Sequence, residues 1–189
     1  FSDPSQIPTF LLSKFAKNKI KVAISGDGAD ELFGGYPRYK STSELWNRLC
    51  HPSYKVFQKL HKLSYIFSGS NSKVLRSIGK KIRKIGHSNL ENLYNDQLSR
   101  WRPDEGIYDS NITNKTFFNK NFPSNKSISD FRYLLFRDLV TYLPGNLLVK
   151  IDRASMANSL EVRSPYLEPN LVKFVWSLPD EYIHNNNTD

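Results

Sequence analysis

A glycine-rich acidic turn directly after a short apolar run constrains the fold of this chain more than any other feature. Residues 21–39 read KVAISGDGADELFGGYPRY, and the first four residues are typical of a buried β-strand. Gly26 and Gly28 allow the backbone of the turn to approach a ligand closely or to adopt positive φ. Because open α/β sheets bind ligands at the carboxyl ends of their strands, the sequence predicts a ligand site here.

Three carboxylates accompany the glycines: Asp27, Asp30 and Glu31. Mg²⁺ is usually held by one or two carboxylates together with substrate phosphate oxygens, so this turn is a candidate site for magnesium and phosphate. The same residues also fit the acidic first turn of a short surface helix, where the helix dipole favours negative charge. Glu31 occupies the position of the third glycine in a dinucleotide-binding loop, and GxxxxGK[ST] is absent, so neither known phosphate loop decides between these interpretations.

Helical periodicity dominates the rest of the chain. A helix is expected from Pro8 to Ala16, a second apolar stripe over residues 56–67 and a third over residues 74–85, ended by Gly86. Further helices are expected after a Ser88/Glu91 capping box, after a cap at Ser129 or Asp130, from Leu147 to Leu160 behind a Pro144-Gly145 turn, and from Pro169 to Trp176.

The turn SGDGADELFGGYPRY (residues 25–39) closely resembles the signature of the synthetase domain of glutamine-hydrolysing asparagine synthetases, members of the ATP pyrophosphatase group. YLPGNLLVKIDRASMANSLEVRSPYLE (residues 142–168) and FSDPSQIPTFLLSKFA (residues 1–16) resemble two further motifs, in the family's order. The resemblance implies an α/β fold, here a predominantly helical fragment of an adenine-nucleotide alpha-hydrolase-like domain with a single clear parallel-type strand. Residues 1–189 would form part of that domain: a nucleotide and magnesium region (1–40), a helical region (41–126) and a helical lobe (127–189).

In this family the aspartate side-chain carboxylate attacks the α-phosphorus of ATP, and glutamine-derived ammonia then attacks the β-aspartyl-AMP. By position in the motif, Ser25 and Gly26 match residues that contact ATP, Asp27 matches the acidic residue implicated in adenylate formation, and Asp30 matches a magnesium ligand. Asp27 is one methylene shorter than the glutamate of some members. The resemblance thus implies a carbon–nitrogen ligase that uses ATP and Mg²⁺.

The second motif carries Arg153, Glu161 and Arg163, which the resemblance places on the acyl side of the site. A buried Glu161–Arg163 pair with a purely structural role is the alternative, and it is the one we favour. Tyr166 and Glu168 replace the usual phenylalanine and aspartate, a change expected to affect local capping.

Other parts of such an enzyme are expected outside residues 1–189: the SGGxDS pyrophosphate loop, a KxGF-like lysine segment and the glutaminase domain. We therefore expect an internal piece that does not turn over alone. A related amidotransferase, or a β-lactam-forming synthetase that adenylates another carboxylate, remains an alternative.

The chain is basic, with 27 Lys and Arg against 18 Asp and Glu and a net charge of +9. A non-catalytic basic helical module that binds polyanions is therefore a further alternative. In the run Lys80–Lys84, however, Ile82 lies on the apolar stripe, which leaves the charges for the solvated face. No nucleic-acid motif and no apolar run long enough to span a membrane occurs, so neither partner is expected. The single cysteine, Cys50, excludes an internal disulfide and favours a cytoplasmic location.

Overall fold

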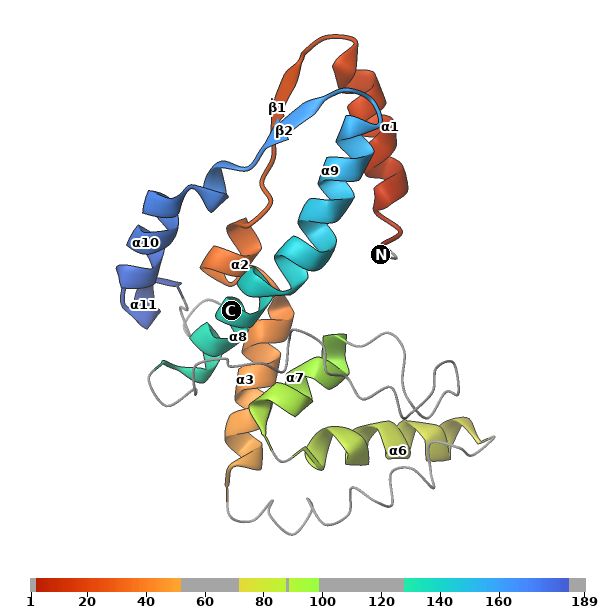
Figure 1. Cartoon of the computed structure of the whole chain (residues 1–189). Coiled ribbons are helices and arrows are strands. Elements are labelled where there is room, and N and C mark those ends of the chain that lie inside the picture. Colours follow the sequence, from red (N-terminus) through yellow and green to blue (C-terminus); the bar gives the residue numbers. More distant parts are fainter. Residues whose placement is uncertain (1–2, 52–71, 88, 99–127, 184–189) are drawn as a thin grey trace. The chain divides into compact units, whose positions relative to one another are not determined.

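The computed structural model describes residues 3–51, 72–87, 89–98 and 128–183 (Figure 1). The chain divides into two compact units, one formed by Phe1–Tyr39 with Asn125–Asp189 and the other by Lys40–Ser124. The candidate turn belongs to the first unit. The expected stripe at 56–67 lies outside the described residues.

A two-stranded parallel sheet joins distant segments of the first unit. Strand β1 (Val22–Ile24) pairs with β2 (Glu161–Arg163), with Ala23 opposite Val162. The sequence predicted only one clear strand, because the three residues of β2, Glu-Val-Arg, are too few to show a strand pattern of their own. The prediction of a buried β1 is wrong: Ile24 is 77% exposed, since the residues that the structure describes leave this side of the strand uncovered.

The helices of the first unit are α1 (Gln6–Lys17), α2 (Ala29–Phe33), α8 (Asp130–Val140), the π-helical η5 (Leu143–Leu147), α9 (Leu148–Met156), the 3₁₀ turn η6 (Pro165–Leu167), α10 (Pro169–Ser177) and α11 (Asp180–Ile183). Among them, α1 and α9 lie beside this sheet, and α2 follows β1 (Figure 1). Helix α1 packs along α9, and α2 packs against α8 and α10.

Several helix ends follow the expected local chemistry. Ser129 caps α8, and its side chain accepts a hydrogen bond from the amide of Arg132. Glu168 caps α10 in the same way, accepting from the amide of Leu171 at 2.9 Å. Ser129 was one of the two caps predicted for α8, the other being Asp130, whereas the sequence connected Glu168 only with an effect on local capping. Helix α1 begins at Gln6, two residues before the predicted start, with Pro8 still in the first turn, where its missing N–H costs no helix hydrogen bond.

The predicted helix from Leu147 to Leu160 is wrong at both ends. Pro144 and Gly145 do not form a separate turn but lie in η5, which runs directly into α9. Pro144 is the second residue of η5, where a backbone N–H would have no partner within the helix, so the chain stays helical there. Helix α9 ends at Met156, and Ser159 adopts φ of 56° where the chain turns into β2.

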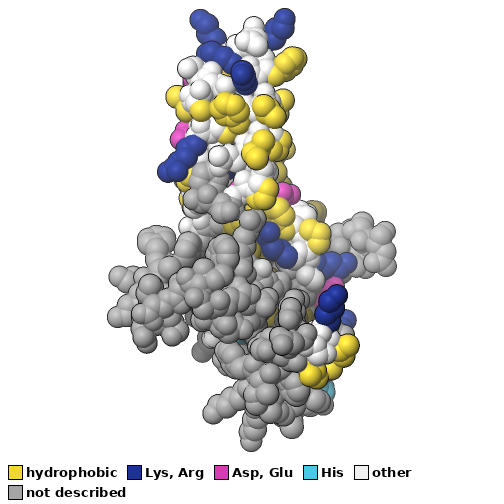
Figure 2. All heavy atoms as spheres, turned by 90° about the vertical axis from the view of Figure 1, so that its right-hand side faces the viewer, with side chains coloured by type: hydrophobic (Ala, Val, Ile, Leu, Met, Phe, Trp, Pro, Cys, Tyr) yellow, Lys and Arg dark blue, Asp and Glu magenta, His cyan; other side chains and the backbone are white. Residues whose placement is uncertain are grey.

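The core of the first unit lies between α2, α8, η5 and α10, where the buried residues include Leu32, Phe131, Leu134, Leu135, Leu143 and Val175. Gly34 ends α2 with φ of 72°, and a Cβ atom there would overlap the ring of Phe131. Glycine at this position thus allows α2 and α8 to approach closely. By contrast, α1 carries exposed hydrophobic side chains, among them Ile7, Leu11, Leu12 and Phe15. Figure 2 shows hydrophobic side chains on the surface of the first unit.

The second unit contains the following helices: α3 (Pro37–Leu49), whose first turn belongs to the first unit, α6 (Lys73–Ile85) and α7 (Leu90–Leu98). Helix α6 coincides with the predicted stripe and ends before Gly86. The expected cap Ser88 lies outside the described residues, and Asn89 accepts from the amide of Asn92 at 2.7 Å. Over the described part of the chain, no helix is long and apolar enough to cross a membrane.

Candidate nucleotide site

Two serines meet where the parallel strands end. Ser25 follows β1, and its amide donates to the carbonyl oxygen of Arg163 at 2.9 Å. Its hydroxyl lies 2.9 Å from the hydroxyl of Ser164, which follows β2. Because the carboxyl ends of parallel strands share one edge of the sheet, the acidic turn and the end of the second motif lie side by side. Ser164 is a residue that the sequence pattern did not single out.

The two glycines of the turn differ in what surrounds them. Gly28 is buried, has φ of 94° and precedes α2; a Cβ atom there would lie 2.5 Å from Leu167 Cδ2. Gly26 is exposed, and a Cβ atom there would meet no atom of the chain within 4 Å. Gly28 therefore serves the fold, because it allows η6 to pack on the turn. Gly26 faces open space at the edge of the sheet, where a ligand has room.

Asp27 and Asp30 are both accessible to solvent: Asp27 is half-buried and Asp30 is exposed. Asp30 Oδ1 occupies the space that a Cβ atom on Gly35 would need, so its carboxylate is folded back over the end of α2. No group of three or more His, Cys, Asp or Glu residues in the described ranges is arranged to hold a metal ion. An exposed Asp30 nevertheless suits Mg²⁺, which takes only one or two protein carboxylates when phosphate supplies further oxygens.

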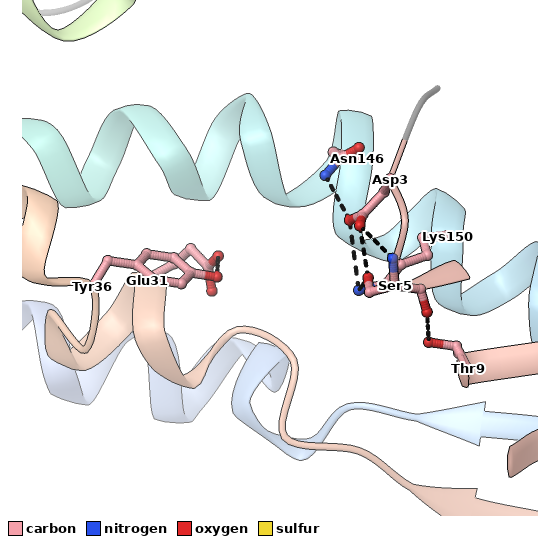
Figure 3. Close-up of polar contacts among 7 residues, drawn as sticks. All are labelled: Asp3, Ser5, Thr9, Glu31, Tyr36, Asn146 and Lys150. Carbon is pink, nitrogen blue, oxygen red and sulfur yellow. Dashed lines mark hydrogen bonds and ion pairs between the residues drawn. The ribbon is translucent and has the colours of Figure 1, made fainter. Parts of the chain in front are cut away.

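Glu31 is buried, so the interpretation of this residue as part of the acidic first turn of a surface helix is wrong. Its side chain is 1% exposed, and Oε1 accepts a hydrogen bond from the Tyr36 hydroxyl at 3.1 Å (Figure 3). Successive residues of a helix point about 100° apart, so the residue after exposed Asp30 faces the core. Burial raises the pKa of Glu31, and the charges of Asp138 and Asp30 add to the rise, against hydrogen bonds from its own backbone amide and Tyr36.

Arg38 packs against the rings of Tyr36, Tyr39 and Tyr142. The sequence pattern did not indicate its ion-pair partner, Asp138. Arg38 Nη2 lies 2.6 Å from Asp138 Oδ2, and its guanidinium lies 3.9 Å from the ring centroid of Tyr36. The Tyr39 hydroxyl donates to the same Asp138 oxygen at 2.7 Å. Burial, and then the Glu31 carboxylate, raises the pKa of Tyr36. The only available signal was the Tyr-Pro-Arg-Tyr run directly after Gly35.

The charged side chains of the second motif are exposed on β2 and α9. Arg163 Nε donates to Glu161 Oε1 at 2.8 Å, but both side chains are exposed, so the prediction of a buried pair is wrong. Residues i and i+2 of a strand share a face, and on β2 the described residues leave this face open. Arg153 is exposed on α9 and lines a groove of about 530 Å³ between α1 and α9, together with apolar residues that include Ile7, Phe10 and Leu11.

A second polar cluster joins the start of α1 to η5 and α9 (Figure 3). Asp3 Oδ1 accepts from the amide and hydroxyl of Ser5 at 2.9 and 2.7 Å, and Asp3 Oδ2 accepts from Asn146 at 3.3 Å. Lys150 Nζ lies 3.9 Å from Asp3 Oδ2 and donates to the Ser5 hydroxyl at 3.1 Å. Burial favours a higher pKa for Asp3, but the hydrogen bonds from Ser5 and the Lys150 charge outweigh it and lower the pKa. These contacts join two of the motifs that resemble the family, residues 1–16 and residues 142–168.

The asparagine synthase family pattern matches residues 1–189, the whole chain. This chain belongs to the asparagine synthase family. It is 33% identical to asparagine synthetase [glutamine-hydrolyzing] 1 of Bacillus subtilis over 99% of its own residues and 29% of that protein. It is 31% identical to a putative asparagine synthetase [glutamine-hydrolyzing] of Mycobacterium tuberculosis, over 94% of its residues and 27% of that protein. The family predicted from the three motifs is therefore confirmed.

A more distant relative is a putative asparagine synthetase [glutamine-hydrolyzing] 2 of Methanocaldococcus jannaschii, 29% identical over 82% of this chain and 30% of that protein. No solved structure matches the chain significantly. The chain spans less than a third of the length of these curated relatives.

Proposed function

We propose that this chain is the central part of the synthetase domain of a glutamine-hydrolysing asparagine synthetase, with an adenine-nucleotide alpha-hydrolase-like fold. The observation that carries the proposal is the open space at Gly26, next to Ser25 at the carboxyl edge of a parallel sheet. In a family of asparagine synthetases, this edge suits the phosphates of ATP, because the backbone can approach them without a side chain in between.

The proposed reaction begins when the side-chain carboxylate of aspartate attacks the α-phosphorus of ATP and pyrophosphate leaves. Ammonia derived from glutamine then attacks the acyl carbon, which gives asparagine and AMP. Little covalent chemistry falls to the protein, so its contribution is to orient the reactants and to offset negative charge. The catalytic unit in this proposal is the full-length, cytoplasmic enzyme with its glutaminase domain, and residues 1–189 alone are inactive.

Within this proposal the turn contributes most of the contacts. Ser25 and the backbone at Gly26 contact ATP, Asp27 supports formation of the adenylate, and Asp30 binds magnesium. When bound, Mg²⁺ offsets the charge of the pyrophosphate. The partial exposure of Asp27 and the exposure of Asp30 support these roles, because both residues are accessible to a ligand at the sheet edge.

Arg153, Glu161 and Arg163 are proposed contacts on the acyl side. The exposed Glu161–Arg163 pair supports this role better than a structural one, because an ion pair in solvent contributes only about 0 to 1 kcal/mol to stability.

The test is an assay of the full-length protein with ATP, Mg²⁺, glutamine and aspartate, in which we expect asparagine, AMP and pyrophosphate. Aspartate should be replaced in parallel by other carboxylic acids, including β-amino acids that can form a lactam. Pyrophosphate release with another acid and none with aspartate would assign the chain to a related amidotransferase or a β-lactam-forming synthetase instead.

The roles of the two aspartates can be separated by ATP–pyrophosphate exchange in the full-length protein. Asp30→Asn should weaken the response to Mg²⁺, because an amide oxygen still coordinates but no longer offsets the metal's charge. Asp27→Asn should slow exchange with less effect on ATP binding. Wild-type exchange in both variants would remove these assignments and leave the turn a structural role only.

A further inference from the structure

Glu31 connects the candidate site to the core of the first unit. It directly follows Asp30 in α2, and its buried carboxylate accepts the Tyr36 hydroxyl across the two glycines that end the helix. Helix α2 has only five residues, so it contains little internal hydrogen bonding to fix its own orientation. The orientation of Asp30 must therefore depend on what holds Glu31.

Tyr36 is itself held on several sides. The Arg38 guanidinium lies over its ring, the ring of Tyr142 packs edge-on at a centroid distance of 6.3 Å, and the ring of Tyr39 lies at 5.6 Å. Arg38 is fixed in turn by Asp138 of α8, whose side chain is fully buried. A tyrosine surrounded in this way has few rotamers available, so its hydroxyl defines a fixed point for Glu31.

We propose that Glu31 and Tyr36 are positioning residues for the acidic turn, and that their hydrogen bond sets the direction in which Asp30 presents its carboxylate to magnesium and pyrophosphate. The inference rests on the proposed function, since it concerns how that site is held. Neither side chain needs to touch substrate. Their effect passes along one peptide unit from Glu31 to Asp30.

The Asp30 side chain is the part most open to such control. It is exposed and lies against Gly35, a residue without a side chain that could hold it in place. A small rotation of α2 would therefore redirect this carboxylate while the surrounding core stays packed. Loss of the Glu31–Tyr36 hydrogen bond should thus affect the response to magnesium more than it affects folding.

The test uses the full-length protein and measures the Mg²⁺ concentration that gives half-maximal ATP–pyrophosphate exchange, with kcat and the thermal unfolding midpoint measured alongside. Tyr36→Phe keeps the ring and removes only the hydroxyl. We expect it to raise the half-saturating Mg²⁺ concentration roughly fivefold, the factor that corresponds to one lost hydrogen bond. In Glu31→Asp the side chain is too short for its carboxylate to reach Tyr36, so this variant should give the same shift. It tests the positioning role if Tyr36→Phe does not fold.

Two further variants separate positioning from general loss of structure. Glu31→Gln keeps an oxygen acceptor of the same length and should restore the Mg²⁺ response to within about twofold of wild type. Tyr142→Phe removes a hydroxyl from the same aromatic group, one for which the described part of the chain records no hydrogen bond, and should behave as wild type. A merely structural role would instead lower the unfolding midpoint without a change in the Mg²⁺ response.

The outcomes distinguish this inference from the proposed function. If Asp30→Asn impairs exchange while Tyr36→Phe and Glu31→Asp respond to Mg²⁺ as Tyr142→Phe does, the positioning role is wrong and the proposed function stands. If the wild-type protein shows no aspartate-dependent exchange, or Asp30→Asn leaves exchange intact, the assignment of the site fails, and this inference fails with it.

Discussion

Asp30 Oδ1 lies in the space that a β-carbon of Gly35 would occupy. The two residues are brought together by the tight end of α2, where the amides of Gly34 and Gly35 both donate to the backbone carbonyl of Asp30. A glycine at the end of a helix is usually explained by its backbone conformation, and Gly34, with φ of 72°, is such a case. Gly35 is different: positive φ is confined to Gly28, Gly34 and Ser159 among the described residues, so Gly35 provides space and not an unusual φ.

We therefore expect Gly35→Ala to move the Asp30 carboxylate while leaving the fold largely intact. The clashing atom is the end of a flexible side chain, which can rotate away, so the free energy of unfolding should change by less than about 1 kcal/mol. The Mg²⁺ response of ATP–pyrophosphate exchange should weaken, as in Asp30→Asn. Thermal unfolding and exchange in the full-length protein measure the two effects. A Gly35→Ala enzyme with a normal Mg²⁺ response would show that the observed orientation of Asp30 is unimportant.

At the start of the turn, Gly26→Ala should weaken ligand binding without lowering stability. The added methyl group meets no atom of the chain, so the unfolding midpoint should stay within a few degrees of wild type. It would nevertheless project into the space proposed for the phosphates of ATP, and the Kd for Mg-ATP should rise at least tenfold, the result of a steric clash of about 1.4 kcal/mol or more. Isothermal titration calorimetry on the full-length protein measures this.

Gly145→Ala is the matched control, because a Cβ atom there also meets nothing within 4 Å, and Gly145 belongs to η5 and not to the turn. It should change neither stability nor nucleotide affinity to a measurable degree. Equal ATP affinity in Gly26→Ala and Gly145→Ala would contradict the proposed phosphate position.

The Asp3 cluster predicts a stability effect in acid. Hydrogen bonds from Ser5 and the charge of Lys150 hold the pKa of Asp3 below its ordinary value of 3.8, although burial acts against them. A carboxyl group whose pKa is lower in the folded state stabilises the fold above the unfolded pKa, and this contribution is lost as pH falls through the folded pKa. The midpoint of thermal unfolding should therefore be lower in Asp3→Asn than in wild type at pH 6, with a difference that shrinks below about pH 3.8. A difference independent of pH would assign the effect to hydrogen bonds alone.

Glu168 predicts a purely structural effect. Its carboxylate accepts from the amide of Leu171 and caps α10, and loss of such a cap costs about 1 kcal/mol. Glu168→Ala should therefore lower the unfolding midpoint by a few degrees and leave exchange activity unchanged, whereas Glu168→Asp keeps a capping oxygen and should be nearly neutral. Differential scanning calorimetry tests the pair. If Glu168→Asp destabilised the protein as much as Glu168→Ala, the cap would require the longer side chain that this chain carries.

The local features of this chain were predictable from neighbouring residues. The order of strand, glycine turn and short helix over residues 21–35, the α6 helix and the Ser129 cap all follow from patterns within a few residues, and the three motifs were sufficient to identify the family. Short-range features are predictable because hydrogen bonding at a helix end and the conformational freedom of glycine depend on adjacent residues.

Long-range packing, by contrast, determines which side chains face the core and which residues distant in the sequence come into contact. Glu31 is buried and the Glu161–Arg163 pair is exposed, the reverse of both expectations, because burial depends on what packs against a residue and not on its own polarity. The partners of Ser25 and Arg38, which are Ser164 and Asp138, are about a hundred or more positions away along the chain. Contacts at such separation arise from the pairing of β1 with β2 and the packing of α2 on α8, which no local pattern encodes.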